Sequence, residues 1–168
     1  MPSRKPRRKG RAASDGERRQ LAYASRHGAA PAARPAPAAS ALLLCDGGSR
    51  GNPGPAAAAA VLLAPDGAVL AQRALPIGRA TAAEAEYRAI LLGLELAATH
   101  GADPVEIRSD SRLAIAAVER DTPADALLAG LVADIRARSR AFSAVRWSWC
   151  PRAENALADG LVRELLWT

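Results

Sequence analysis

Four acidic residues in four separate segments are candidate ligands of a metal ion. Asp46 and Asp110 each end an apolar, strand-like run. Glu86 and Asp159 lie in helix-like runs, and their neighbours three and four positions away are apolar. A carboxylate directed at an apolar core is costly unless a cation meets it, and several carboxylates brought together repel one another. Divalent metal is the simplest remedy, so the pattern predicts a two-metal site suited to phosphodiester chemistry.

The segments that carry these residues predict a mixed sheet. Three apolar runs joined by turns indicate an antiparallel meander, and two later strands, each reached through helices, indicate parallel additions. The predicted strands span 41–45, 56–63, 68–75, 105–109 and 145–150. The predicted helices span 81–99, 112–120, 124–140 and 156–167. We therefore expect an α/β fold whose five-stranded mixed sheet has its first three strands antiparallel and helices on its faces.

Local signals mark the ends of the longest predicted helix. Thr81 followed by Glu84 fits a capping box, in which each residue satisfies a free backbone N–H of the other. His100, before a glycine, fits the last position of the helix. In the last predicted strand Trp147 and Trp149 alternate with a serine, so both are expected to face the core, with base stacking as the alternative.

The positive charge of the chain is concentrated at its start. Residues 1–40 hold ten Lys or Arg and two acidic residues, a formal charge of +8, whereas residues 41–168 carry −2. The first segment is rich in Pro and Ala and has one aromatic residue, so it cannot bury enough apolar surface to offset its ordering entropy. We expect a disordered tail and linker over 1–40 and a folded domain over 41–168. The tail is either a tether for polyanions or an aid to solubility.

The remaining composition indicates a cytoplasmic protein with no contact with a membrane, and we expect a monomer, although the sequence does not specify the oligomeric state. No apolar run approaches the roughly 20 residues that a membrane-spanning helix needs, and no secretory signal is expected. The two cysteines, Cys45 and Cys150, end strand-like runs and are expected to be buried free thiols of a reducing compartment, with a disulfide as the alternative.

Four motifs together resemble the type 1 ribonuclease H family, in particular its short, reverse-transcriptase-like branch. They are Asp46-Gly-Gly-Ser-Arg-Gly-Asn-Pro-Gly-Pro55, Ala83-Glu-Ala-Glu-Tyr87, Ser109-Asp-Ser111 and Asn155-Ala-Leu-Ala-Asp159. The resemblance covers about residues 41–167. It implies a ribonuclease H-like fold and an endoribonuclease that cleaves the RNA strand of RNA–DNA hybrids with two Mg²⁺ ions, for which Mn²⁺ is a possible substitute.

The resemblance also implies roles for individual residues. Asp46 would bridge the two metal ions, Glu86 and Asp110 would hold the ion at the leaving oxygen, and Asp159 would hold the ion that carries the attacking water. Glu86 is preferred to Glu84 because it directly precedes a tyrosine, as in the family motif. The residues expected to contact the hybrid lie in the glycine-rich turn predicted over 46–55, and they are Gly47, Gly48, Ser49 and Asn52.

Three departures from the family pattern leave the substrate open. Ala82 and Ala83 stand where bacterial members have asparagines that help to read the 2′-hydroxyl, which separates RNA from DNA. The loop over 150–155 lacks the histidine of many members, and Glu154 is a candidate substitute. The basic protrusion of larger members is missing, and the tail is a candidate source of the affinity that this protrusion would supply. The alternatives are a non-catalytic nucleic-acid-binding module and a nuclease for duplex RNA or single strands.

Overall fold

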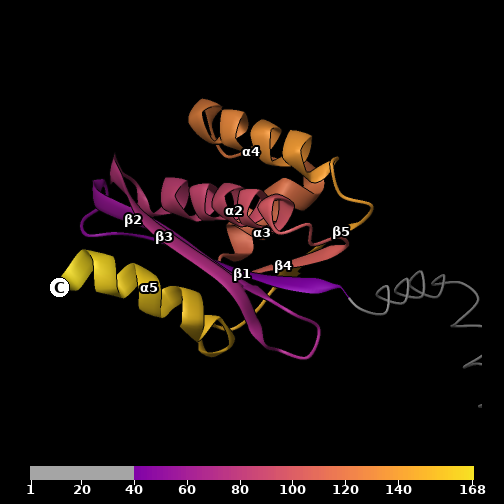
Figure 1. Ribbon diagram of the computed structural model, residues 1–168. Helices are drawn as coiled ribbons and strands as arrows, with labels where there is room; N and C mark the ends of the chain where they lie inside the picture. Colours follow the sequence, from indigo (N-terminus) through magenta and orange to yellow (C-terminus); the bar gives the residue numbers. More distant parts are fainter. Residues whose placement is uncertain (1–39) are drawn as a thin grey trace, which may run out of the picture. The chain divides into compact units, whose positions relative to one another are not determined.

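A five-stranded mixed sheet forms the centre of the protein, with strand order β3-β2-β1-β4-β5 (Figure 1). The computed structural model describes residues 40–168, so the tail predicted over residues 1–40 lies almost wholly outside the described residues. The first three strands are antiparallel, and β4 and β5 run parallel to β1. The strands are β1 (Ala41–Ser49), β2 (Gly54–Leu63), β3 (Val69–Ala80), β4 (Val105–Ser109) and β5 (Val145–Trp149). The predicted α/β architecture is confirmed.

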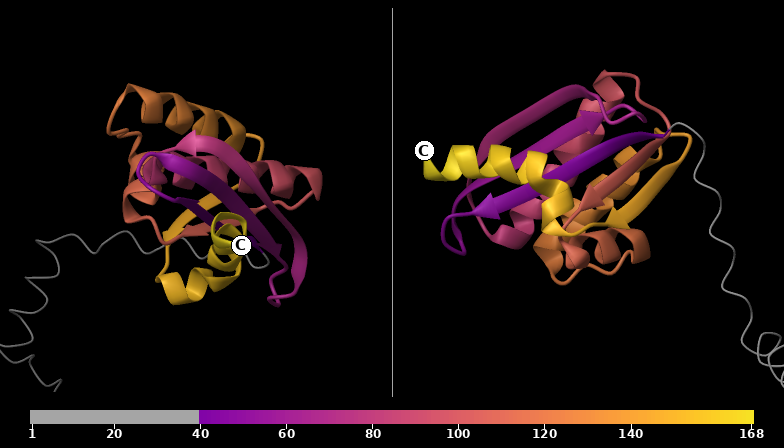
Figure 2. Two further views of the ribbon diagram at one scale, coloured as in Figure 1. Left: turned by 90° about the vertical axis from the view of Figure 1, so that its left-hand side faces the viewer. Right: turned by 90° about the horizontal axis from the view of Figure 1, so that it is seen from below.

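Helices cover both faces of this sheet (Figures 1 and 2). The helix α2 packs on β1 and β2 from one side, with α3 and α4 beside it, and α5 packs on β1, β2 and β3 from the other side. The helical elements are α2 (Ala82–Thr99), α3 (Arg112–Arg120), α4 (Ala126–Ser139), the short 3-10 helix η1 (Arg152–Asn155) and α5 (Ala156–Trp167). In the part of the chain that the structure describes, no helix is long and apolar enough to cross a membrane.

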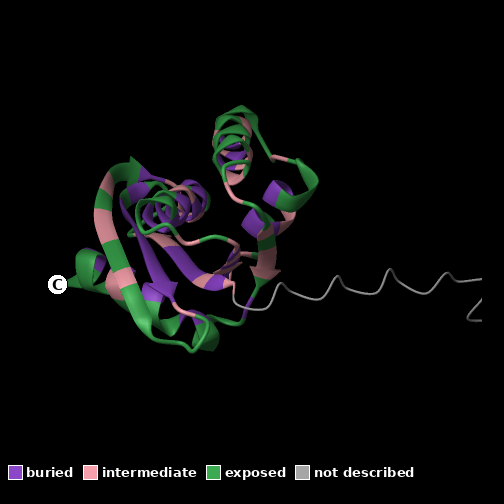
Figure 3. Ribbon diagram, turned by 45° about the vertical axis from the view of Figure 1, so that its right-hand side comes forward, coloured by how far each residue is buried: buried purple, intermediate pink, exposed green. Residues whose placement is uncertain are grey.

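Alternation along β1 divides the core between the two helical layers. Leu43 and Cys45 belong to the cluster that packs against α2, whereas Leu44 packs with Ala158 of α5. This follows from the period of two in a strand, where successive side chains point to opposite faces. Figure 3 shows the result as buried residues on the central strands and on the inward faces of the helices. Both cysteines are buried and unpaired, as predicted.

The first and third strands are longer than the sequence predicts. Asp46 is expected to end its strand, but β1 continues to Ser49 and Asp46 pairs with Ala59 inside the ladder. The turn between β1 and β2 is therefore shorter than the predicted 46–55. Likewise β3 continues to Ala80, because β2 offers it a pairing partner as far as Gly54. Backbone pairing with a neighbouring strand extends both elements beyond their apolar runs.

Helix caps explain where the helices begin. The Thr81 side chain accepts a hydrogen bond from the Glu84 backbone N–H at 3.1 Å, and His100 is the C-terminal cap of α2, as predicted. The expected reciprocal role of Glu84 is wrong, because its carboxylate pairs with Arg88 at 2.7 Å. The helix expected from residue 124 begins at Ala126, because Asp125 caps it by accepting from the Leu128 N–H at 2.9 Å.

Candidate active site

A fork between two parallel strands creates the candidate site. Pairing of β1 with β4 stops at Leu44 and Arg108, and the two strands then diverge. Asp46 follows on β1, and Asp110 follows directly after β4. The carboxyl ends of parallel strands beside a diverging pair are where open α/β sheets place their ligands. The fork therefore directs two carboxylates of distant segments to one edge of the sheet.

The helix α2 adds a third carboxylate to these two. Carboxylate oxygens of Asp46, Glu86 and Asp110 lie within 4.8 Å of one another, a spacing that suits a shared metal ion. The structure places Glu86, rather than Glu84, in this group, because Glu84 faces Arg88 on another side of the helix. Side chains two positions apart on a helix point in different directions.

The electrostatics of this cluster call for a cation. Burial, followed by the charges of Asp110 and Asp159, raises the pKa of Asp46 to about 7. Burial and the charges of Asp46 and Asp110 raise the pKa of Glu86 to about 9, although the Gly47 N–H and the Ser109 hydroxyl oppose the rise. Without a bound cation, Glu86 is mainly protonated at neutral pH, and Asp46 is near the midpoint of its titration. A divalent ion would reverse that preference, because it stabilises the ionised form.

The fourth predicted ligand, Asp159, lies beside the cluster rather than within the group of three. It is in the first turn of α5 and is buried, and its charge helps to raise the pKa of Asp46. One of its oxygens accepts a hydrogen bond from Arg152, and Arg163 approaches the other oxygen at 3.8 Å. In this structure two arginines therefore supply the positive charge next to Asp159.

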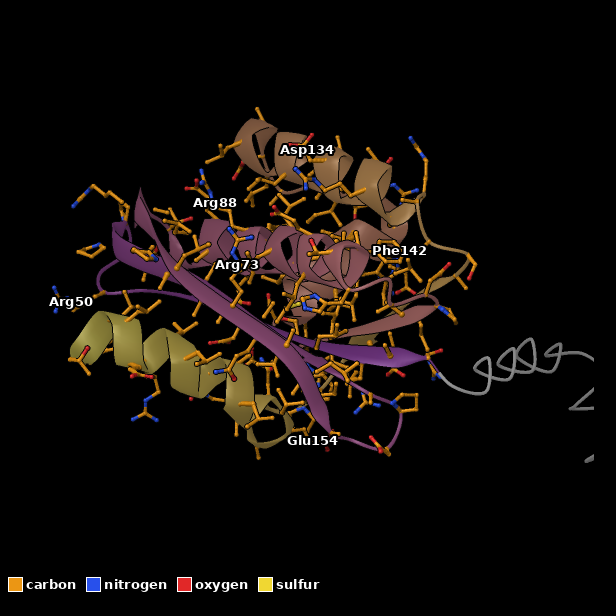
Figure 4. The ribbon with its side chains drawn as sticks, in the orientation of Figure 1. Arg50, Arg73, Arg88, Asp134, Phe142 and Glu154 are labelled. Carbon is orange, nitrogen blue, oxygen red and sulfur yellow. The ribbon has the colours of Figure 1, made fainter. Side chains whose placement is uncertain are left out.

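Arg152 is a site residue that the sequence did not reveal. Besides contacting Asp159, its charge lowers the pKa of Asp46. Glu154, the candidate proposed from the sequence for the missing histidine's role, is exposed and is labelled beside the first turn of α5 in Figure 4. The position of Arg152 in the sequence could have indicated this role, because it lies in the predicted loop over 150–155, just before the helix that carries Asp159. A cation in that loop lies within reach of the carboxylates.

Trp149 is a second residue whose role differs from the expectation. The prediction of core packing holds for Trp147, which is partly buried against the main cluster, but Trp149 is 39% exposed. Its indole N–H donates to the backbone carbonyl of Asp110 at 3.1 Å. The guanidinium of Arg112 stacks over the same ring, 3.4 Å from its centre. Trp149 therefore holds the backbone of a predicted metal ligand.

Two residues of the predicted hybrid contact are required by packing inside the protein. A Cβ on Gly47 would lie 2.1 Å from the carbonyl carbon of Ala85 in α2, and a Cβ on Gly48 would lie 2.9 Å from Val162 in α5. Real Cβ contacts are not so short, so only glycine allows both helices to approach β1 this closely. Contact of Gly47 and Gly48 with nucleic acid stays a prediction beside this packing role.

The other two predicted contacts are Ser49, the last residue of β1, and Asn52 in the turn, and they bond to the end of β3 and the start of α2. The Ser49 hydroxyl donates to the carbonyl of Ala80 at 2.9 Å. The Asn52 side-chain oxygen accepts from the Ala82 N–H at 3.1 Å, which satisfies a free donor of the helix end. Arg50 fixes the far side of the turn by donating to the carbonyl of Leu166 at the end of α5 (Figure 4). The turn is thus held in place next to the carboxylates.

A largely apolar groove of about 470 Å³ borders the cluster. It lies between α2, α3 and α4, and Glu86 and Asp110 are among its lining residues. The alanines that depart from the family pattern also line it. Its other lining residues are Ala82, Ala83, Tyr87, Ser111, Leu113, Ala114, Ala117, Thr122, Ala124 and Leu128. The groove offers space for a substrate beside two of the carboxylates.

Comparison with known proteins gives consistent matches over the folded part. A family model described as reverse transcriptase-like matches residues 44–165. A ribonuclease HI of Halobacterium salinarum (strain ATCC 700922 / JCM 11081 / NRC-1) is 43% identical over 129 residues, which are 72% of this chain and 61% of that protein. A bifunctional protein of Mycobacterium tuberculosis (strain ATCC 25618 / H37Rv) is 38% identical over 127 residues, 74% of this chain and 35% of that protein. The chain thus spans less than two thirds of these relatives.

Solved structures agree with these matches. The crystal structure of RNase H1 from Halobacterium salinarum NRC-1 superposes with a TM-score of 0.72 at 37% identity, covering 74% of this chain and 96% of that one. LC11-RNase H1, solved in complex with an RNA/DNA hybrid, superposes with a TM-score of 0.71 at 30% identity, covering 74% and 95%. These matches place the fold of the described part in one family.

Proposed function

Because this chain belongs to the reverse-transcriptase-like branch of the type 1 ribonuclease H family, we propose that it cleaves the RNA strand of RNA–DNA hybrids by hydrolysis. The cluster of Asp46, Glu86 and Asp110 carries the proposal, since these carboxylates converge from three segments at the fork of the sheet. A module that only binds nucleic acid gains nothing from clustered negative charge near phosphates. The observed charge therefore favours an enzyme over a binding module.

The residues present suit Mg²⁺, which prefers hard oxygen ligands and keeps several water molecules. Asp46, Glu86, Asp110 and Asp159 would hold two such ions, with Mn²⁺ as a possible substitute. Bound ions would supply an activated water and stabilise the charge on the leaving oxygen. The raised pKa values of Asp46 and Glu86 support this assignment, because they mark a site that lacks positive charge.

Other residues of the chain would orient the substrate. Ser49 bonds the end of β3, and Asn52 anchors the turn to α2. The turn would therefore present its backbone to a sugar-phosphate chain at a fixed place. The groove beside Glu86 and Asp110 gives the bound strand room next to the carboxylates. Arg152, which contacts Asp159, places a cation where a phosphate would approach. We propose Gly47, Gly48, Ser49 and Asn52 as the hybrid contacts.

A nuclease for another substrate is the second candidate, and Ala82 and Ala83 favour it. Both alanines line the groove, where a methyl group cannot donate or accept a hydrogen bond to a 2′-hydroxyl. Recognition of the RNA strand would then depend on the backbone of the turn. If that recognition is weak, duplex RNA or single strands become substrates as well.

One set of cleavage assays separates these functions. Labelled hybrid, duplex RNA, duplex DNA and single strands are each incubated with Mg²⁺, Mn²⁺ or a chelator. We expect cleavage of the RNA strand in the hybrid, with either metal and not with the chelator. Cleavage of duplex RNA or single strands at a similar rate would favour the second candidate. Tight binding of the hybrid without any cleavage would overturn the enzymatic proposal.

We also propose that the protein acts as a cytoplasmic monomer. Two free thiols, Cys45 and Cys150, are compatible with a reducing compartment and support the location. Light scattering of the purified full chain checks the oligomeric state.

A further inference from the structure

Asn155 stands at the N-terminal cap position of α5 but does not cap the helix. Its side chain makes no capping hydrogen bond, whereas Thr81, Ser111 and Asp125 all accept a backbone N–H of the helix that they precede. Those three residues have an extended backbone, whereas Asn155 is also the last residue of η1, which runs directly into α5. The Asn155 side chain is fully buried, so its polar atoms need hydrogen-bond partners inside the protein.

The contact that Asn155 makes lies at the fork of the sheet. Its Nδ2 donates to the backbone carbonyl of Cys45 at 2.9 Å, across 110 positions of sequence. Pairing between β1 and β4 has ended one residue earlier, at Leu44 and Arg108. Asn155 thus bonds the backbone of β1 just past the point where β4 stops doing so. A buried carbonyl left without a partner would be costly.

The same bond connects two of the proposed metal ligands. Asp46 directly follows Cys45 on β1, and Asp159 lies four positions after Asn155, about one turn along the chain. The Oδ1 of Asn155 is buried and receives no hydrogen bond from the residues that the structure describes. Among the described residues, the Asn155 side chain therefore makes one hydrogen bond, and that bond joins these two segments.

We propose that Asn155 is a positioning residue that fixes Asp159 relative to Asp46 and thereby sets the affinity of the site for divalent metal. The inference rests on the proposed function, because it needs those carboxylates to bind metal. Residues behind the ligands of a metal commonly act in this way, and their replacement weakens metal binding by about 10- to 100-fold.

Metal titration of the full chain tests this proposal without relying on cleavage. Asn155→Ser keeps a polar side chain at the start of α5 but is too short to reach the Cys45 carbonyl, and Asn155→Leu retains the approximate size of the side chain without its donor. Calorimetric titration with Mn²⁺ should give a dissociation constant about 10- to 100-fold higher in each variant than in the original protein. Stabilisation of the fold by Mn²⁺ in thermal unfolding should shrink in parallel.

A matched control separates positioning from general loss of stability. Val132 is fully buried in α4, a helix that packs mainly on α2 and α3, so Val132→Ala should lower the unfolding temperature but leave Mn²⁺ affinity unchanged. In assays at saturating metal, the Asn155 variants should lower kcat more than they raise KM for the hybrid. That split would not follow from instability alone.

The outcomes distinguish this inference from the proposed function. If the original protein binds Mn²⁺ and either folded Asn155 variant binds it equally well, the positioning role is overturned while the nuclease proposal stands. If the original protein shows no Mn²⁺ binding, the metal-dependent function is overturned and the inference with it. Should Asn155→Ser fail to fold, the Asn155→Leu titration decides.

Discussion

The residues of the carboxylate cluster are held in a state that is unfavourable without a cation. Asp46 is 5% exposed, and Glu86 and Asp110 lie against it. Burial raises the pKa of both Asp46 and Glu86, and the neighbouring charges add to the rise. The folded, metal-free protein therefore binds protons that the unfolded chain has released. Stability and metal binding are coupled through these two groups.

The first prediction concerns the pH dependence of that stability. The ordinary pKa values are 3.8 and 4.5, and the folded values are about 7 and about 9. Between these limits the folded state holds more protons, so the free energy of unfolding should fall as pH rises. The contribution is complete below about pH 4 and absent above about pH 9. Urea denaturation in chelator at several pH values measures it.

A variant provides the control for this measurement. Asp46→Asn removes one of the two protons at issue, so the decline with pH should become shallower. Addition of Mg²⁺ should raise stability more at pH 8 than at pH 5, because metal competes with protons for the same oxygens. A metal-free stability that rises across this range, with the same slope in Asp46→Asn, would contradict the assignment.

The second prediction tests which acidic residues take part in catalysis. Glu86→Gln and Asp110→Asn should each lower hybrid cleavage by more than about 10²-fold, the scale of losing one pre-organised electrostatic group. Glu84→Gln is the matched control, because Glu84 is also buried in α2 but pairs with Arg88. It should retain most of the activity. Substantial activity of Asp110→Asn in Mg²⁺, with circular dichroism unchanged, would refute the site.

At the scale of elements, close approach of helices to β1 builds the site. Gly47 faces the backbone of α2, and Gly93 of α2 faces the sulfur of Cys45, where an added Cβ would lie 2.7 Å away. Because these glycines have no side chain, α2 can pack closely against β1. The distance between β1 and α2 in turn decides whether Glu86 reaches Asp46. A glycine in this motif is therefore a packing requirement that serves the carboxylates.

The third prediction follows from this packing. Gly47→Ala should destabilise the fold by about 1–3 kcal/mol or more, because the new methyl group would meet the Ala85 carbonyl rather than a flexible side chain. Gly130→Ala in α4 is the matched control, since beyond its chain neighbours and its own helix backbone no atom lies within 4 Å of its added Cβ. It should stabilise the helix by about 0.5–1 kcal/mol. Equal free energies of unfolding for the two variants would show that α2 does not pack closely against β1 at Gly47.

At the scale of the whole molecule, charge and chemistry are separated along the chain. Residues 1–40 carry a formal charge of +8, while residues 41–168, which include the carboxylate cluster, carry −2. A folded part with net negative charge does not attract a polyanion by its overall field. The basic segment is the larger source of electrostatic affinity for nucleic acid.

The fourth prediction is that removal of residues 1–40 weakens binding more than chemistry. KM for the hybrid should rise. The slope of log KM against log salt concentration should become shallower, by about one for each phosphate that the segment neutralises in the full chain. The rate at saturating hybrid should change little, since the carboxylates lie outside the removed segment. Rates measured from about 50 to 200 mM salt with and without the segment decide this, and an unchanged salt slope would refute a tethering role.

The sequence by itself determined the type and order of the main helices and strands, the free thiols, and the three carboxylates that the structure brings together, with Asp159 as a proposed fourth ligand. Apolar periodicity and turn residues are local properties, and the motifs keep their spacing along the chain. Tertiary structure alone decided that Arg152 contacts Asp159, that Trp149 holds the Asp110 carbonyl, and that Asn155 bonds β1 instead of capping α5. It also extended β1 past Asp46. Such contacts depend on which donor meets which acceptor after distant segments have packed, and no local pattern specifies that.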